Sequence, residues 1–261
     1  MRVRGVSPLY TAIILLVFLL PNPIVHATSN SIPIAGRYST LVIGIRIPGM
    51  PKWAHDTILN ATTIWNEAQE WYESSVGLHG RVYLLEESNE GSATISFTMP
   101  EAYSKIAVGW TNYQFASGTR TILSTQSFLD PSIFGVDDSG NLTAQRYGFW
   151  LALHELGRVM GLGSVLDGRD IMDPRATSNR ATQPPVLSTL DLYALDVLAS
   201  GSTPSYVTLP IATPNQFVDA TSFISTRQNG AIPTPEFNGF PALLATISLA
   251  AVFVCLRRRR S

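Results

Sequence analysis

Two periodicities in the hydrophobic pattern predict a sheet crossed by a long helix. The run TLVIGIRI at residues 40–47 is β-branched and apolar, and Pro48 ends it, which is typical of a buried strand. Within residues 54–72, apolar positions recur every three or four residues and leave the glutamates outside their stripe, as on an amphipathic helix. Short strand-like runs follow at residues 81–86, 93–99 and 119–125.

Two further helices are predicted in the second half of the chain. One runs from a cap near Asn141 to about Gly161. The other begins after Ser188, because Asp191 stands at the N3 position of an acidic capping box, and Gly201 ends it. With no internal repeat, these elements predict one folded unit in which helices pack on a sheet.

The N-terminus has the pattern of a secretory signal peptide. Arg2 and Arg4 precede an apolar run, prolines break that run, and small residues lead to a cleavage position after Ala27. An uncleaved N-terminal anchor is the alternative interpretation of residues 1–27. In either case, we expect the chain from residue 28 onward to be exported.

The C-terminal part of the sequence predicts a stalk and a membrane anchor. Residues 202–238 are rich in Thr, Pro, Ser and Asn, a composition typical of a stalk. The 17 residues of 240–256 carry no charge, which is enough to cross a bilayer core of about 30 Å as a helix. Arginines at 257–260 follow, and the positive-inside tendency places them in the cytoplasm. We therefore expect 239–261 to be a transmembrane anchor with its cytoplasmic tail, and the domain to be extracellular.

Pro235, Glu236 and Phe237 stand directly before this span. The order of Pro-Glu-Phe, apolar helix and terminal arginines resembles the C-terminal sorting signals of some prokaryotic surface proteins. The resemblance implies that a membrane transpeptidase cuts near Pro235 and exchanges the helix for another anchor. A plain single-pass anchor is the alternative.

Composition and charge narrow the classes of partner. Hydrophobic residues make up 45% of the chain and charged residues only 14%, which rules out a long disordered chain. Six of the 18 basic residues lie at the two ends, so the part between them is acidic. Lys52 and Lys105 are the only lysines. Because nucleic-acid binders concentrate Lys and Arg on one face, we expect no nucleic acid among the partners.

The stretch LHELGRVMGLGSVLDGRDIMDP, at residues 153–174, carries the candidate chemistry. It resembles the metzincin metallopeptidases, most closely the matrixins. In that family a helix carries His-Glu-x-x-His, continues with x-x-Gly-x-x-His, and is followed by a turn with a buried Met below the metal. His154, Glu155, Gly161 and Met172 stand at the matching positions.

The resemblance implies a role for each matching residue. His154 would be a zinc ligand, Glu155 the general base on a zinc-bound water, and Met172 the methionine of the Met-turn. The second and third ligand positions of the family are Arg158 and Ser164 in this chain. We expect neither to ligate zinc, because a guanidinium has no lone pair to donate and a serine hydroxyl is a weak neutral ligand.

Two acidic residues close to the motif are candidate substitutes for the missing ligands. Asp167 and Asp170 could hold a metal weakly together with one histidine. The alternative is that one of them pairs with Arg158 or Arg169 and the other lies in a turn. Arg158 can also pair with Glu155 at the i, i+3 spacing, which would occupy the expected general base.

The resemblance extends beyond the motif, from about Thr40 to Gly201. It includes a strand, a long helix with Trp65-Asn66, further strands, the His-Glu helix, the Met-turn and a Leu-Ser-x-x-Asp helix. It implies an α+β, matrixin-like fold for residues 28–201, with a twisted mixed sheet of about five strands and three helices.

Two functions of different classes remain open from the sequence. The first is an anchored extracellular zinc endopeptidase that acts on proteins or peptides and recruits unidentified substitutes for the missing ligands. The second is a pseudopeptidase that keeps the fold, needs no cofactor, and binds peptides or builds part of the cell surface. Arg158 and Ser164 favour the second, whereas His154 and Glu155 favour the first.

Overall fold

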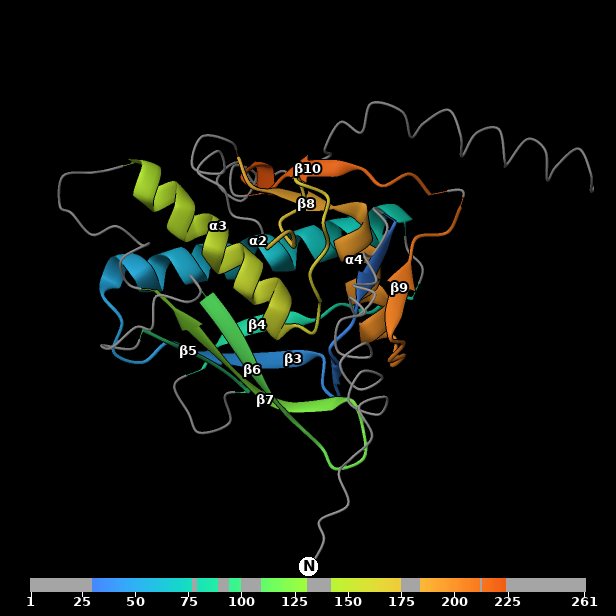
Figure 1. Ribbon diagram of the computed structural model, residues 1–261, viewed down its shortest axis with the longest axis horizontal. Coiled ribbons are helices and arrows are strands. Elements are labelled where there is room, and N and C mark those ends of the chain that lie inside the picture. Colours follow the sequence, from blue (N-terminus) through green and yellow to red (C-terminus); the bar gives the residue numbers. More distant parts are fainter. Residues whose placement is uncertain are drawn as a thin grey trace, which may run out of the picture.

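The computed structural model describes residues 30–76, 79–88, 94–99, 109–130, 142–174, 184–211 and 213–223 (Figure 1). The expected signal peptide, the Pro235–Phe237 motif and the expected anchor lie outside these described residues. Within the described ranges, no helix is both long and apolar enough to cross a membrane.

Six strands of the described chain form one mainly parallel sheet. Five of them pair in parallel, in the spatial order β2 (Arg37–Tyr38), β7 (Thr121–Leu129), β5 (Ile95–Thr98), β3 (Val42–Arg46) and β4 (Leu84–Glu87). The sixth, β6 (Gly109–Phe115), pairs antiparallel with β7. Each strand run expected from the sequence overlaps one of these strands, so those predictions are confirmed.

The described part of the chain has three helices: α2 (Lys52–Val76), α3 (Leu142–Val159) and α4 (Thr189–Ala199). The first two lie across the same side of the sheet (Figure 1), where α2 packs against α3 and β4, and α3 packs against β6 and β7. The structure therefore confirms a mixed α/β architecture with three helices on a sheet.

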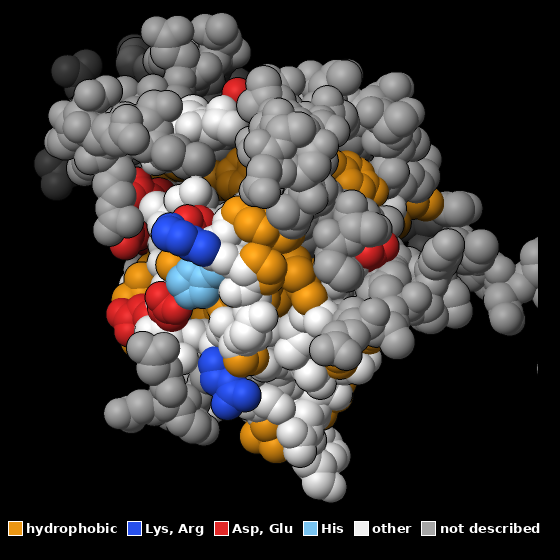
Figure 2. Space-filling view, turned by 90° about the vertical axis from the view of Figure 1, so that its left-hand side faces the viewer, with side chains coloured by type: hydrophobic (Ala, Val, Ile, Leu, Met, Phe, Trp, Pro, Cys, Tyr) orange, Lys and Arg blue, Asp and Glu red, His pale blue; other side chains and the backbone are white. Residues whose placement is uncertain are grey.

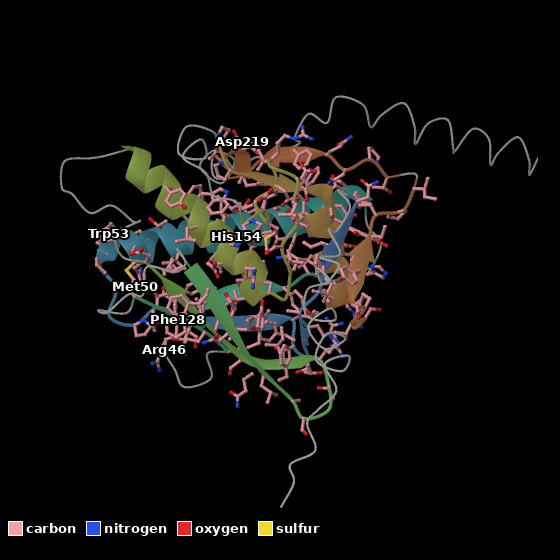
Figure 3. All side chains as sticks on the ribbon, viewed as in Figure 1. Arg46, Met50, Trp53, Phe128, His154 and Asp219 are labelled. Carbon is pink, nitrogen blue, oxygen red and sulfur yellow. The ribbon has the colours of Figure 1, made fainter. Side chains whose placement is uncertain are left out.

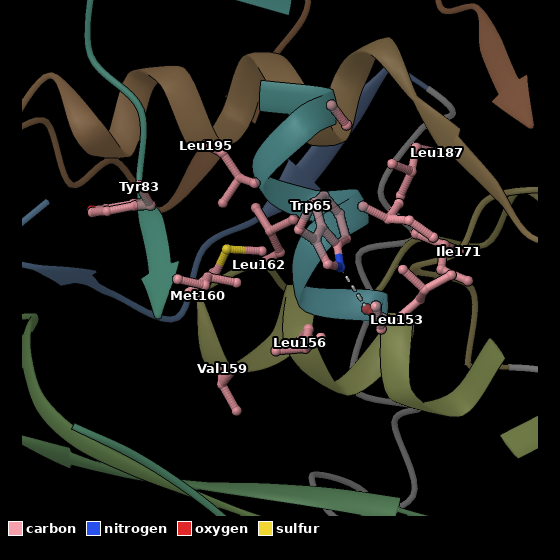
Figure 4. Close-up of a cluster of buried hydrophobic side chains, with 14 of the residues drawn as sticks. Trp65, Tyr83, Leu153, Leu156, Val159, Met160, Leu162, Ile171, Leu187 and Leu195 are labelled. Atoms are coloured by element: carbon pink, nitrogen blue, oxygen red, sulfur yellow. Dashed lines mark hydrogen bonds between the residues drawn. The ribbon is translucent and has the colours of Figure 1, made fainter. Parts of the chain in front are cut away.

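The apolar stripe of α2 faces the interior, as its period predicts. Its buried members are Ala54, Ile58, Ala61, Trp65, Ala68 and Tyr72. Trp65 stands at the centre of the core, among side chains from α3, α4 and the turn after α3 (Figure 4). Its indole N–H donates a 3.0 Å hydrogen bond to the carbonyl oxygen of Leu153, which joins α2 to the helix that carries the His-Glu pair.

The start of α4 has the predicted capping box. The Ser188 hydroxyl accepts from the Asp191 amide at 3.1 Å, and the Asp191 carboxylate accepts from the Ser188 amide at 3.0 Å. Both residues are buried, so the box satisfies two backbone donors that would otherwise lack partners inside the protein.

The folded part extends beyond Gly201, where we expected the stalk to begin. Strand β9 (Tyr206–Thr208) pairs with β1 (Ser31–Pro33), and β10 (Phe217–Asp219) pairs with β8 (Val186–Ser188). The buried side chains of this segment are Val207, Leu209, Val218 and Phe223. Its Thr- and Pro-rich composition hid these two short strands, because each exposes the residues on either side of one buried position.

Candidate functional site

His154 lies on α3 in the interior of the molecule (Figure 3), with 5% of its surface exposed. Its Nδ1 donates to the carbonyl oxygen of Ile171 at 2.7 Å, and its ring stacks on Trp150 with centroids 5.2 Å apart. A carbonyl oxygen can only accept, so the ring proton resides on Nδ1. In the neutral imidazole, Nε2 is then the nitrogen that carries the lone pair.

The turn that supplies the Ile171 carbonyl also places Met172 beneath α3. Met172 is fully buried, and a Cβ added to Gly157 would lie 2.5 Å from its sulfur. Asp170 holds the turn, because its carboxylate accepts from the Met172 amide at 2.7 Å. Met172 therefore packs under the His-Glu helix, at the place where the resemblance puts the Met-turn.

Glu155 is buried, with 3% of its surface exposed, and it contacts the sheet. Its Oε2 accepts a 2.7 Å hydrogen bond from the Thr111 hydroxyl on β6 and a 3.4 Å hydrogen bond from the Ser127 hydroxyl on β7. Gly109 leaves room for the Glu155 carboxylate, since a Cβ at position 109 would lie 2.8 Å from Glu155 Oε1. The carboxylate is thus held by hydroxyl groups of two neighbouring strands.

Arg158 and Ser164, at the second and third ligand positions of the family motif, are in direct contact. Arg158 Nη1 donates a 2.9 Å hydrogen bond to the Ser164 hydroxyl. Both residues are partly exposed, whereas His154 and Glu155 are buried. The fold therefore brings the second and third ligand positions of the motif together. The side chains at these positions, Arg158 and Ser164, bind each other.

Gly161 makes the turn between these two residues. Its φ of 103° lies in the region that favours glycine, and a Cβ there would overlap the carbonyl oxygen of Gly36. Its amide donates to the Arg158 carbonyl at 2.8 Å, and the Tyr113 phenol donates to the same carbonyl at 2.7 Å. Burial raises the pKa of Tyr113, and the nearby guanidinium of Arg158 opposes that rise.

The proposed substitutes for the missing ligands lie in other interactions. Asp167 forms a 3.6 Å ion pair with Arg169, which confirms one of the two alternatives for this residue. The pair between Arg158 and Glu155 that the i, i+3 spacing allows does not form: among the described residues, Arg158 donates to Ser164 and Glu155 accepts from hydroxyls. Helical spacing allowed that pair, but β6 supplies closer partners for the carboxylate.

Asp170 packs beside Asp191 and not beside His154. Both carboxyl groups are fully buried. Burial raises the pKa of Asp191, and the neighbouring Asp170 carboxylate raises it further, while burial also raises the pKa of Asp170. Two adjacent buried carboxyl groups favour a shared proton. The pair therefore connects the turn that holds Met172 to α4.

The residues of the site do not fit a zinc ion. Zinc needs three protein ligands with lone pairs, and Arg158 instead brings a positive charge. Within the described ranges, no group of three or more His, Cys, Asp or Glu side chains is placed to hold a metal. The other two histidines of the described chain contact acids elsewhere: His55 lies 2.7 Å from Glu87, and His79 lies 2.7 Å from Asp196.

One face of the molecule carries charged side chains of both signs. Figure 2 shows, on the face drawn there, basic and acidic side chains close together around a histidine, beside an apolar area. Two ion pairs on α2 and β4 have this mixed character, Lys52 with Asp56 at 2.5 Å and His55 with Glu87.

Strand β6 supplies the contacts of the site that the sequence analysis missed. Thr111 binds Glu155 and Tyr113 binds the carbonyl of Arg158, yet we predicted no strand at 109–115. The available signal was a run of aromatic and β-branched residues, GWTNYQF, before the turn at Gly118. Asn112 and Gln114 interrupt that run, and both side chains are exposed.

The sequence matches no protein-family model and no curated protein sequence. The likeness to matrixins consequently rests on the residues of 153–174 and on the order of the elements around them. Function has to be inferred from the chemistry of the site.

Proposed function

We propose that this protein is a pseudopeptidase: an extracellular, membrane-anchored module of matrixin-like architecture that binds peptide segments without cleaving them. The observation that carries the proposal is the hydrogen bond between Arg158 and Ser164, at the two positions where a working enzyme of that family needs ligands. The anchoring part of the proposal rests on the apolar run at 240–256 and the arginines after it, and export rests on the signal-peptide pattern of 1–27.

Electrostatics favours the pseudopeptidase over the zinc endopeptidase. A divalent ion about 4 Å from a guanidinium would be opposed by roughly 8 kcal/mol at an effective dielectric constant of about 20. Complete structural zinc sites bind with about 10–16 kcal/mol, and this chain retains one of the three family ligands. The repulsion therefore offsets most of what even a complete ligand set would supply.

Peptide binding is supported by the position of β6. Among the described strands, β6 pairs only with β7, so its other edge lies at the border of the sheet. Such an edge presents backbone donors and acceptors that an extended peptide can pair with. Tyr113 links this strand to α3 at Arg158, which puts the strand edge and the motif next to each other.

The zinc endopeptidase is the second candidate, and one observation favours it. The hydrogen bond from His154 Nδ1 to the Ile171 carbonyl sets the tautomer that a zinc-ligating Nε2 requires. With zinc as cofactor, Glu155 would act as general base in the adjacent position. This candidate still needs two ligands from outside the described part of the chain.

The two candidates are separated by metal analysis and a cleavage assay on the same sample. The purified full-length chain is dialysed against trace metals, its zinc content is measured, and cleavage of a fluorogenic peptide mixture is followed beside Glu155→Ala. We expect less than about 0.1 zinc per chain, the level that a weak site retains on dialysis, and no cleavage that depends on Glu155. Near one zinc per chain with Glu155-dependent cleavage would establish the endopeptidase instead.

A further inference from the structure

The guanidinium of Arg158 is only partly satisfied by the protein. It carries five N–H donors, and Nη1 binds the Ser164 hydroxyl. Its Nε is buried and has no hydrogen-bond partner among the described residues. A desolvated, charged donor without a partner is unfavourable in the free protein.

Its positive charge is not paired with a carboxylate of the described chain. Arg169, eleven residues further on, has an ion pair with Asp167. Among the described residues, the neighbours of the Arg158 guanidinium are neutral: the Ser164 hydroxyl and the Tyr113 phenol. The nearest acid along the helix, Glu155, accepts from Thr111 and Ser127 instead. Among the residues that the structure describes, no carboxylate neutralises this partly exposed cation near the end of α3.

From this arrangement we infer that Arg158 recognises a carboxylate of the bound peptide, with the Ser164 hydroxyl holding the guanidinium in place. The inference rests on the proposed function as a peptide-binding module. A guanidinium offers two parallel N–H groups that match a carboxylate, and partial desolvation strengthens the pair. Because β6 lies beside Arg158, a peptide paired with this strand carries one of its side chains, or its C-terminus, to the guanidinium.

The test uses the full-length chain in detergent and four pools of fluorescein-labelled hexapeptides, each randomised except at its third position. Two pools have an amidated C-terminus and carry Glu or Gln at that position, a third carries Gln with a free C-terminal carboxylate, and a fourth carries Lys with the amide. Fluorescence polarisation gives an apparent Kd for each pool. The Glu and free-carboxylate pools distinguish a side-chain carboxylate from a C-terminal one.

We expect one of the carboxylate pools to bind about tenfold more tightly than the amidated Gln pool, the ratio that one well-formed charge-assisted pair supplies. Arg158→Gln should reduce this ratio to about one, and Arg158→Lys should retain part of it, since it keeps the charge but loses the parallel N–H groups. Arg169→Gln is the matched control: its side chain is 69% exposed and its partner is Asp167, so the ratio should stay unchanged.

The outcomes separate this inference from the proposed function. Binding of all pools with equal affinity would overturn recognition of a carboxylate and leave the peptide-binding module standing. Absence of binding to any pool would overturn both. A preference that survives in Arg158→Gln would assign the recognition to another residue. Should Arg158→Gln fail to fold, the comparison of pools on the unmodified chain and on Arg158→Lys still decides.

Discussion

Two glycines with the same backbone angle allow the packing of the motif turn to be measured. Gly161 and Gly201 both have a φ of 103°. Around Gly201, a Cβ would meet nothing within 4 Å, whereas at Gly161 it would overlap the carbonyl oxygen of Gly36. Replacing each with alanine therefore adds the same backbone strain at both positions and a backbone clash at only one.

The expected losses follow from these two terms. An L-residue held at such a φ costs about 1–3 kcal/mol, so Gly201→Ala should lower the free energy of unfolding by that amount. Overpacking against a backbone atom adds about 1–3 kcal/mol, because a carbonyl in a turn cannot rotate away as a side chain can. Gly161→Ala should accordingly lose about 1–3 kcal/mol more than Gly201→Ala. The gain from a stiffer unfolded chain, about 0.4–1 kcal/mol, is common to both and cancels in the difference.

Urea unfolding of the full-length chain, followed by tryptophan fluorescence, measures both losses. The comparison is valid where the two variants share the slope m of the unmodified protein. Equal losses for Gly161→Ala and Gly201→Ala would show that the turn has room for a methyl group. The close approach of Gly161 to the segment before β2 would then be refuted, and with it the packing that places Ser164 beside Arg158.

Three further predictions concern the site and the core. Replacing both Arg158→His and Ser164→His should create a site that binds about one zinc per chain at micromolar concentration, measured by metal analysis after dialysis; no binding would contradict the matrixin-like placement of these positions. The raised pKa of Asp191 makes its contribution to stability largest below the ordinary carboxyl pKa of about 4 and lost as the pH rises through its folded value, so Asp191→Asn should flatten this decline in urea unfolding between about pH 4 and 8. Trp65→Phe should lower the free energy of unfolding by about 1–3 kcal/mol, because it removes a buried hydrogen bond to α3 and leaves a smaller side chain in the core. Thermal unfolding would check this.

The helices could be predicted from the sequence because their signals are local. The period of α2 and the capping box at Ser188 and Asp191 depend on residues three or four positions apart, and the structure confirms both. The order of strands in the sheet depends instead on pairing between distant segments, such as β2 with β7, and no local pattern encodes it.

The site was predictable in its positions but not in its contacts. The resemblance gave Arg158 and Ser164 as two ligand positions of one motif, and in the structure they are in contact. The partners of Glu155 come from β6 and β7, which are distant in sequence, so helical spacing favoured a pair with Arg158 that the fold does not form. Short strands such as β9 and β10 were missed for a related reason, since each buries one residue and therefore shows no alternation.

Preservation of the His-Glu pair is weak evidence for catalysis in this chain, because both residues satisfy buried groups. His154 supplies the donor for the buried Ile171 carbonyl, and Glu155 supplies the acceptor for the buried Ser127 hydroxyl. Replacing either would leave a buried polar group unpaired, at a cost of about 1–3 kcal/mol, whether or not a metal ever binds. The side chain at 158 has no such role, since its hydrogen bond goes to the Ser164 hydroxyl and both residues are partly exposed. Under the proposed function, a scaffold that binds no zinc is free to vary the second and third motif positions while stability maintains the first, and His154, Arg158 and Ser164 fit that expectation.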